Sequence, residues 1–123
     1  MQEWQKHLSG SVVKVEDLPF IPESPEYRDK LEKVAEVFPI RINSYFLNQI
    51  KNEHDPLWKQ VVPTLEELDG FIFNDSPLVS DPLNEEGDMP VPELIHRYPD
   101  RVLLMVNNQC PVICRFCTRK RKI

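Results

Sequence analysis

The residues most capable of chemistry lie near the end of this 123-residue sequence. All three of its cysteines fall in one short segment with the spacing C-x3-C-x2-C: Cys110, Cys114 and Cys117. Three thiolates in one loop can bind three irons of a cubane [4Fe–4S] cluster, because cysteine thiolate is the usual ligand of such clusters. One iron then has no cysteine ligand from this chain and is open to a substrate or cofactor. The spacing therefore predicts a three-cysteine iron–sulfur site.

Other interpretations of the same cysteines stay open. A zinc site could use the three cysteines with His96, although zinc motifs usually come as paired C-x2-C knuckles. With the basic C-terminal tail, such a site would make the chain a zinc-stapled nucleic-acid-binding module. A disulfide framework is disfavoured, because three cysteines leave one unpaired and nothing suggests secretion. A further hypothesis is an inactive helical domain with a frayed C-terminus.

Charge is distributed unevenly along the chain. The net charge of −5 combines 8 Lys and Arg against 19 Asp and Glu in residues 1–96 with 7 against 1 in residues 97–123. The acidic portion is typical of a solvated surface. The basic portion coincides with the cysteines, which favours an anionic ligand or cofactor there.

A helical region, predicted over residues 24–69, precedes the cysteines. Ser24 and Pro25 suit the N-cap and first position of a helix, which Pro39 would end. Its expected buried stripe has helical spacing: Tyr27, Leu31, Val34, Ala35 and Phe38. Three shorter helices are expected to start at Asn43, at Asp55-Pro56 and at the capping box of Thr64. Residues 1–23 read as an arm with short helical turns, which would pack on a partner.

The path to the cysteines is predicted to be extended. Residues 70–95 contain prolines among polar residues and indicate a linker. The apolar run from Val102 to Val106 predicts a strand buried on both faces, as in a parallel sheet. Such a strand needs neighbours that the sequence does not supply. We therefore expect a portion of a longer protein, or a module completed by another chain.

No apolar run approaches the roughly 20 residues that cross a bilayer. The polar N-terminus does not resemble a signal peptide. We therefore expect no membrane association and a cytoplasmic location. The basic end lacks aromatic residues interleaved along a basic face, so no nucleic-acid partner is expected in the leading interpretation.

The cysteine spacing, with Phe116 before the last cysteine and an apolar strand before the loop, resembles the radical S-adenosylmethionine enzymes. The stretches around it are similar to the lysine 2,3-aminomutase family, and the similarity runs from about residue 25 onward. The similar stretches are His96–Arg101, Thr118–Arg121, Ile42–Phe46, Asp55-Pro56, Lys59–Thr64 and Asp81–Leu83.

This resemblance implies a fold, a reaction and partners. The full-length fold would be α/β, a partial α/β barrel, of which this chain holds short α-helices, the first strand and the cluster loop, with the barrel beginning in residues 96–123. The implied reaction moves the amino group of lysine or a related amino acid from C2 to C3. It uses a [4Fe–4S] cluster, S-adenosylmethionine and pyridoxal phosphate. An electron donor such as flavodoxin or ferredoxin, and a homo-oligomeric state, are also implied.

The resemblance also assigns roles by position. Cys110, Cys114 and Cys117 match the cluster ligands, and Phe116 matches a residue beside the adenine of S-adenosylmethionine. Arg119 matches an arginine that binds the substrate carboxylate, which suits a bidentate guanidinium. Three residues match positions near pyridoxal phosphate, with ion pairs to the acidic portion as the alternative interpretation: Arg97, Tyr98 and Arg101.

Other parts of the reaction are expected outside this sequence. Lys120, Arg121 and Lys122 are interpreted as a solvated charge run. The lysine that binds pyridoxal phosphate, the segment for S-adenosylmethionine and the remaining barrel lie downstream in the family. No catalytic residue is therefore assigned in this chain, and the chain alone is expected to be inactive.

Overall fold

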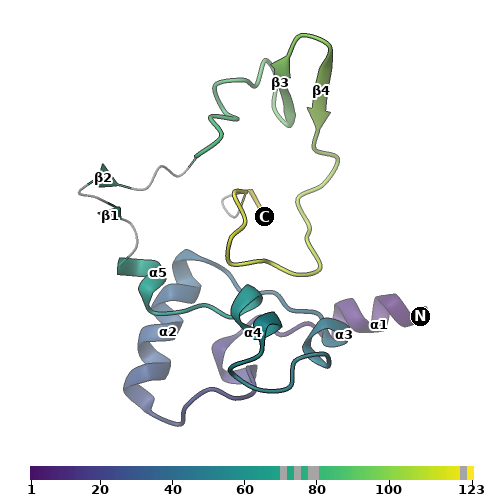
Figure 1. Ribbon diagram of the computed structural model, residues 1–123. Coiled ribbons are helices and arrows are strands. Elements are labelled where there is room, and N and C mark those ends of the chain that lie inside the picture. Colours follow the sequence, from purple (N-terminus) through teal and green to yellow (C-terminus); the bar gives the residue numbers. More distant parts are fainter. Residues whose placement is uncertain (70–71, 74–75, 78–80, 120–121) are drawn as a thin grey trace.

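The computed structural model describes residues 1–69, 72–73, 76–77, 81–119 and 122–123. The named helices lie within residues 3–69, and the strands follow them (Figure 1). The helices are α1 (Glu3–Ser9), the 3₁₀ helix η1 (Val15–Asp17), α2 (Pro25–Val37), α3 (Ser44–Leu47), α4 (Pro56–Val61) and α5 (Glu66–Asp69). The strands are β1 (Ile72–Phe73), β2 (Ser76–Pro77), β3 (Leu94–Tyr98) and β4 (Arg101–Leu104).

The helices start where short polar side chains cap them. The Ser24 hydroxyl accepts a hydrogen bond from the third amide of α2 at 3.4 Å. The Asn43 side chain accepts one at the start of α3 at 2.8 Å, and the Asp55 carboxylate accepts one at the start of α4 at 2.9 Å. These side chains satisfy amides that have no partner within the helix. The predicted starts of these three helices are confirmed.

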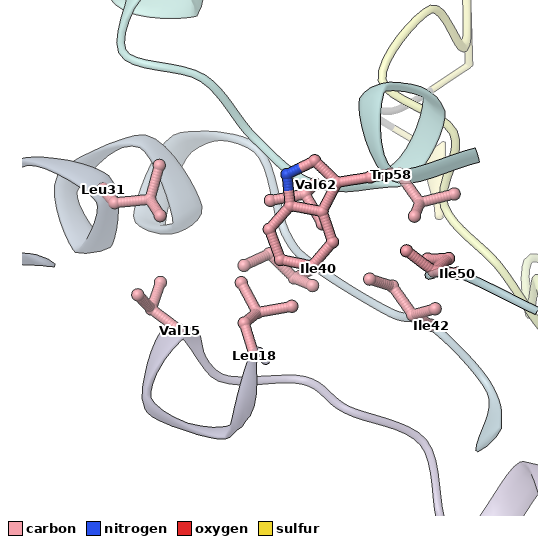
Figure 2. Packing of buried hydrophobic residues seen from close by; sticks show 9 residues of the cluster. Val15, Leu18, Leu31, Ile40, Ile42, Ile50, Trp58 and Val62 are labelled. Carbon is pink, nitrogen blue, oxygen red and sulfur yellow. The ribbon is translucent and has the colours of Figure 1, made fainter. Parts of the chain in front are cut away.

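The hydrophobic core lies among these short helices (Figure 2). Leu31 and Val34 of α2 are 0% exposed, as their place in the predicted stripe requires. Residues 1–23 take part as well, because Val15 and Leu18 are buried against α2 and its neighbours. This segment therefore packs within its own chain. The central cluster consists of Val15, Leu18, Leu31, Ile40, Ile42, Ile50, Trp58, Val61 and Val62.

Strands β3 and β4 form a two-stranded antiparallel hairpin, with Leu94 opposite Leu104 and Tyr98 opposite Arg101. The sequence correctly predicts a strand here, but the prediction that this strand is buried on both faces is wrong. All four residues of β4 are exposed, and the run ends as a strand at Leu104 rather than Val106. The described part of the chain therefore shows no strand buried on both faces.

The reason for this difference is local. Only Pro99 and Asp100 separate the two strands, so β3 is the neighbour that β4 reaches with the shortest loop. The prediction assigned residues 70–95 to a linker and did not provide for β3. The described residues of that stretch form the antiparallel pair β1–β2 and a series of turns before β3.

No helix in the described ranges is long and apolar enough to cross a membrane.

Candidate functional site

The cysteine loop, residues 110–117, is attached to the helical region (residues 1–69). Ile42 is the centre of this attachment, because it forms antiparallel bridges to Val12 on one side and Val112 on the other. Ile42 is also 0% exposed, so the cysteine loop is attached to the helical region at its hydrophobic core. In Figure 1 the C-terminal segment correspondingly passes close to the helices.

Further backbone hydrogen bonds continue this attachment along the loop. The amide of Ile113 donates to the carbonyl of Arg41 at 2.8 Å, and the amide of Arg115 donates to the carbonyl of Gln60 at 2.7 Å. The Asn43 side chain donates to the carbonyl of Pro111 at 3.4 Å. The segment from Pro111 to Arg115 is thus bonded to three places in the helical region.

The side chain of Arg115 adds the strongest of these contacts. Its Nε and Nη2 donate to the two carboxylate oxygens of Glu67 at 2.9 and 2.7 Å. Nη1 and Nη2 also donate to the carbonyls of Pro39 and Phe38, at 3.1 and 3.3 Å. The side chains of Arg115 and Glu67 are 7% and 16% exposed. A bidentate, largely desolvated ion pair therefore joins the cysteine loop to α5, and the carbonyl bonds join it to the two residues after α2.

The three cysteines are free thiols, and each is half-buried. The Cys110 thiol donates to the carbonyl of Val112 at 2.9 Å. The sulfur of Cys117 accepts a hydrogen bond from the amide of Arg119 at 3.4 Å. The amide of Cys117 donates to the carbonyl of Cys114 at 3.2 Å, which closes a turn between these two cysteines.

The donor set fits an iron–sulfur cluster in kind and number. Three cysteine sulfurs lie in one loop, and one of them accepts a backbone N–H bond of the type that tunes cluster potentials. However, no three Cys, His, Asp or Glu side chains of the described residues converge on a point that would hold a metal ion. The same finding covers the zinc arrangement with His96. The ligands are present in the loop, but their side chains are not in a ligating arrangement.

A second feature is a cavity of about 460 Å³ beside the hairpin. We call it the arginine cavity, because three arginines line it together with a tyrosine and a buried glutamate. It brings together all four residues that were assigned to pyridoxal phosphate and to the substrate. The lining residues are Leu83, Glu85, Ile95, Arg97, Tyr98, Arg101, Val102, Leu103 and Arg119.

Within this cavity Arg119 is held by Glu85. Its Nε donates to Oε1 at 2.9 Å, and its Nη2 donates to the same oxygen at 2.5 Å. The Glu85 side chain is 5% exposed and that of Arg119 is 40% exposed. Hydrogen bonding to Glu85 raises the pKa of Arg119 above its ordinary value, and the nearby Cys117 adds to the rise. Arg119 therefore stays a cation with one edge occupied by Glu85.

The hairpin residues make local contacts. Arg97 donates to the carbonyl of Leu83. Arg101 forms a bidentate pair with its neighbour Asp100 at 2.9 and 2.8 Å, and its guanidinium lies 5.5 Å from the centre of the Tyr98 ring. In the described part of the chain, the side chains of Arg97 and Arg101 thus bond residues 83–101.

The remaining assigned residues have different surroundings. Phe116 is 71% exposed, so its ring is accessible to a ligand. The ammonium of Lys122 lies 3.8 Å from the Glu86 carboxylate, and the Lys122 side chain is 18% exposed. The prediction that Lys122 belongs to a solvated charge run is therefore wrong. Lys120 and Arg121 lie outside the described residues.

Sequence reasoning missed Arg115, Glu67 and Glu85 as parts of the site. A charged residue within the apolar and cysteine-rich segment 112–117 was a signal for Arg115, because such a side chain is buried only with a partner. Glu67 lies 48 residues earlier, and no sequence pattern pairs these positions. Glu85 sits among several acidic residues that look alike in the sequence.

No protein-family model matches this chain. Curated relatives do match it over nearly its whole length. The L-lysine 2,3-aminomutase of Acetoanaerobium sticklandii is 38% identical over 122 residues, which is 97% of this chain and 28% of the relative. That of Methanococcus maripaludis is 42% identical over 127 residues, 98% of this chain and 28% of the relative. That of Bacillus subtilis is 35% identical, over 97% of this chain and 25% of the relative.

These matches confirm the resemblance that the sequence predicted. The chain spans about a quarter of the length of these relatives.

Proposed function

We propose, from the premise that this chain belongs to the lysine 2,3-aminomutase family, that it is the cluster-binding portion of an amino acid 2,3-aminomutase. The substrate would be lysine or a related amino acid. The observation that carries the proposal is the C-x3-C-x2-C loop, bonded to the helical region and followed at once by an arginine of the arginine cavity.

The cysteine loop would hold the [4Fe–4S] cluster. Cys110, Cys114 and Cys117 supply three thiolates, and one iron would remain for S-adenosylmethionine. The exposed ring of Phe116 is free to stack on the adenine of that cofactor. When bound, the cluster and S-adenosylmethionine supply the radical chemistry, and the protein binds and orients them.

The arginine cavity would bind anionic groups. Arg97 and Arg101 are permanent cations, and with Tyr98 they offer donors to the phosphate of pyridoxal phosphate. Arg119 remains charged at every physiological pH, and the part of its guanidinium that does not face Glu85 can donate to the substrate carboxylate. The cavity thus binds and orients, and no proton transfer is assigned to these groups.

The proposed reaction also needs residues beyond those of this chain, and the relatives are about four times as long. The chain by itself is proposed to be inactive as an aminomutase. The full protein would take electrons from a small donor such as flavodoxin or ferredoxin, would act in the cytoplasm, and would form a homo-oligomer.

Anaerobic reconstitution with iron and sulfide tests this function. In a protein extended through the barrel, we expect close to four irons per chain and an electron paramagnetic resonance signal after reduction that changes when S-adenosylmethionine is added. A variant with alanine at the three cysteines is the control and should retain no cluster. A colourless protein without a cluster signal would contradict the proposal. One equivalent of zinc with salt-dependent retention on nucleic acid would instead favour the binding-module hypothesis.

A further inference from the structure

The cysteine loop is bonded to the helical region unevenly along its length. The attached segment runs from Pro111 to Arg115, through the bridge of Val112 to Ile42 and the backbone bonds of Ile113 and Arg115. Cys114 lies inside this attached segment. Cys110 precedes it and Cys117 follows it.

The Arg115 side chain bonds residues that are far from it in the sequence. Its guanidinium bonds the Glu67 carboxylate and two backbone carbonyls, which belong to the two residues that follow α2, Phe38 and Pro39. A cation at this point satisfies carbonyls just beyond the end of α2 and lies near the negative end of the helix dipole. One side chain thus connects the loop to α5 and to the two residues after α2.

Burial makes this arrangement specific. With 7% of the side chain exposed, Arg115 has lost most of its hydration, and this cost is offset only while its acceptors remain in place. A lysine at this position keeps the charge but cannot make the planar, two-point bond to a carboxylate. The geometry of the guanidinium, and not charge alone, fixes the loop.

The thiols, in contrast, are not in a ligating arrangement. No three candidate ligands among the described residues converge, and the Cys110 thiol is bonded to the carbonyl of Val112. Binding a cluster therefore requires some of the thiols to move. Because Cys114 lies in the attached segment, the thiols that can move with the least disruption are those of Cys110 and Cys117.

We propose that Arg115 is the positioning residue of the cysteine loop. It fixes Cys114 on the helical region in advance of the cluster, and Cys110 and Cys117 close around the cluster from either side. This inference rests on the proposed function for the role of the cysteines. Arg115 itself touches neither cluster nor substrate and acts through the backbone of the loop.

Alkylation of the individual thiols tests this proposal in the chain without iron. The three thiols are all half-buried, so differences in rate report mainly how often each part of the loop opens. Iodoacetamide labelling followed by peptide mass spectrometry gives one rate for each cysteine. We expect Cys114 to react most slowly in the unchanged protein.

Arg115→Lys should raise the rate ratio of Cys114 to Cys110 by about tenfold, since a charge-assisted hydrogen bond contributes roughly that factor. Glu67→Gln, which removes only the charge of the acceptor, should raise the same ratio by a smaller factor. Arg28→Lys is the matched control, because Arg28 makes one exposed bond to the carbonyl of Pro22, and it should leave the ratio unchanged. Global unfolding would also raise the rate at Cys114, so urea denaturation of each variant gives its unfolded fraction, and Cys114 must react faster than this fraction allows.

An unchanged ratio in both Arg115→Lys and Glu67→Gln would overturn the proposal. If Arg115→Lys does not fold, Glu67→Gln decides alone. A second readout is the release of iron from the reconstituted full-length protein, which should be faster in Glu67→Gln than in Arg28→Lys, and equal release would also count against the proposal. If the unchanged protein takes up no cluster, the proposed function fails, whereas the alkylation rates still decide the role of Arg115.

Discussion

The helical region and the part of the chain that carries the candidate site are stabilised differently. Of the twelve buried hydrophobic residues among those described, ten lie in residues 1–69. Residues 81–119 and 122–123 contribute two, Ile95 and Ile113. The second part also leaves large apolar side chains exposed: Val102, Leu103, Leu104, Val106 and Phe116.

Polar contacts replace the missing core in the second part. Arg115 binds Glu67 and Arg119 binds Glu85, in both cases with a partner side chain that is mostly buried. Hydrophobic burial is non-directional, whereas a bidentate guanidinium–carboxylate pair fixes orientation. The core of the helical region therefore supplies most of the hydrophobic free energy of folding, and the arginine pairs orient the segments that carry the site.

The largest expected effect separates the two regions directly. Leu31→Ala should lower the free energy of unfolding by about 2–5 kcal/mol, because it leaves a cavity at a position that is 0% exposed. Leu103→Ala, at a position 40% exposed on β4, should cost less than about 1 kcal/mol. Urea denaturation followed by circular dichroism measures both. Equal losses would mean that the hairpin shares the core's cooperativity.

A smaller effect is expected for the ion pair in the arginine cavity. Glu85→Gln should lower the free energy of local opening around Arg119 by about 1–2 kcal/mol, less than for a fully buried pair because Arg119 is 40% exposed. Hydrogen exchange measures this opening. The control is Glu86→Gln, whose carboxylate is 65% exposed and lies 3.8 Å from Lys122. An equal effect of both variants would show that burial of Glu85 is unimportant.

Loss of a helix cap should have an effect of about 1 kcal/mol. Ser24→Ala removes the acceptor of the amide at the start of α2 and should destabilise the helical region by this amount. Ser9→Ala is the control, since that exposed hydroxyl donates to a carbonyl of its own helix and caps no amide among the described residues. Thermal unfolding distinguishes them, and a Ser24→Ala midpoint equal to that of the control would argue against the cap.

The smallest predicted effect is a dependence on pH through Asp55. Hydrogen bonds from the amides of Leu57 and Lys51 lower the pKa of this carboxyl in the folded state. Its stabilising contribution is therefore present above the unfolded pKa of about 4 and is lost as the pH falls through the lower folded value. Asp55→Asn, which can cap but not titrate, should lose less stability between pH 5 and pH 3. Identical acid profiles would contradict this assignment.

Much of the helical region could be predicted from residues that act on their own neighbours. Ser24, Asn43 and Asp55 cap helices through amides two or three residues ahead, so their effect can be inferred from sequence alone. For the site, the cysteines and the similarity of their flanking stretches assign roles that stay predictions. The structure places Arg97, Tyr98, Arg101 and Arg119 around one cavity.

Long-range pairings could not be predicted in the same way. Val102–Val106 is apolar enough for a buried strand, but its pairing with the segment that precedes it in the chain left β4 exposed. Arg115 needs Glu67 and the carbonyls of the two residues after α2, which only the folded chain brings together. The periodicity of a sequence shows where apolar side chains recur. It does not show which distant acceptor a buried cation will bind.

Residue-resolved hydrogen exchange of the full chain tests most directly whether the helical region positions the cysteine loop. The amides of Ile113 and Arg115 donate to carbonyls of the helical region at 2.8 and 2.7 Å. We predict that they are protected nearly as well as core amides of α2, and better than the amides of β4. Absence of protection at every residue beyond Pro92 would contradict the account and would show a helical domain with a frayed C-terminus.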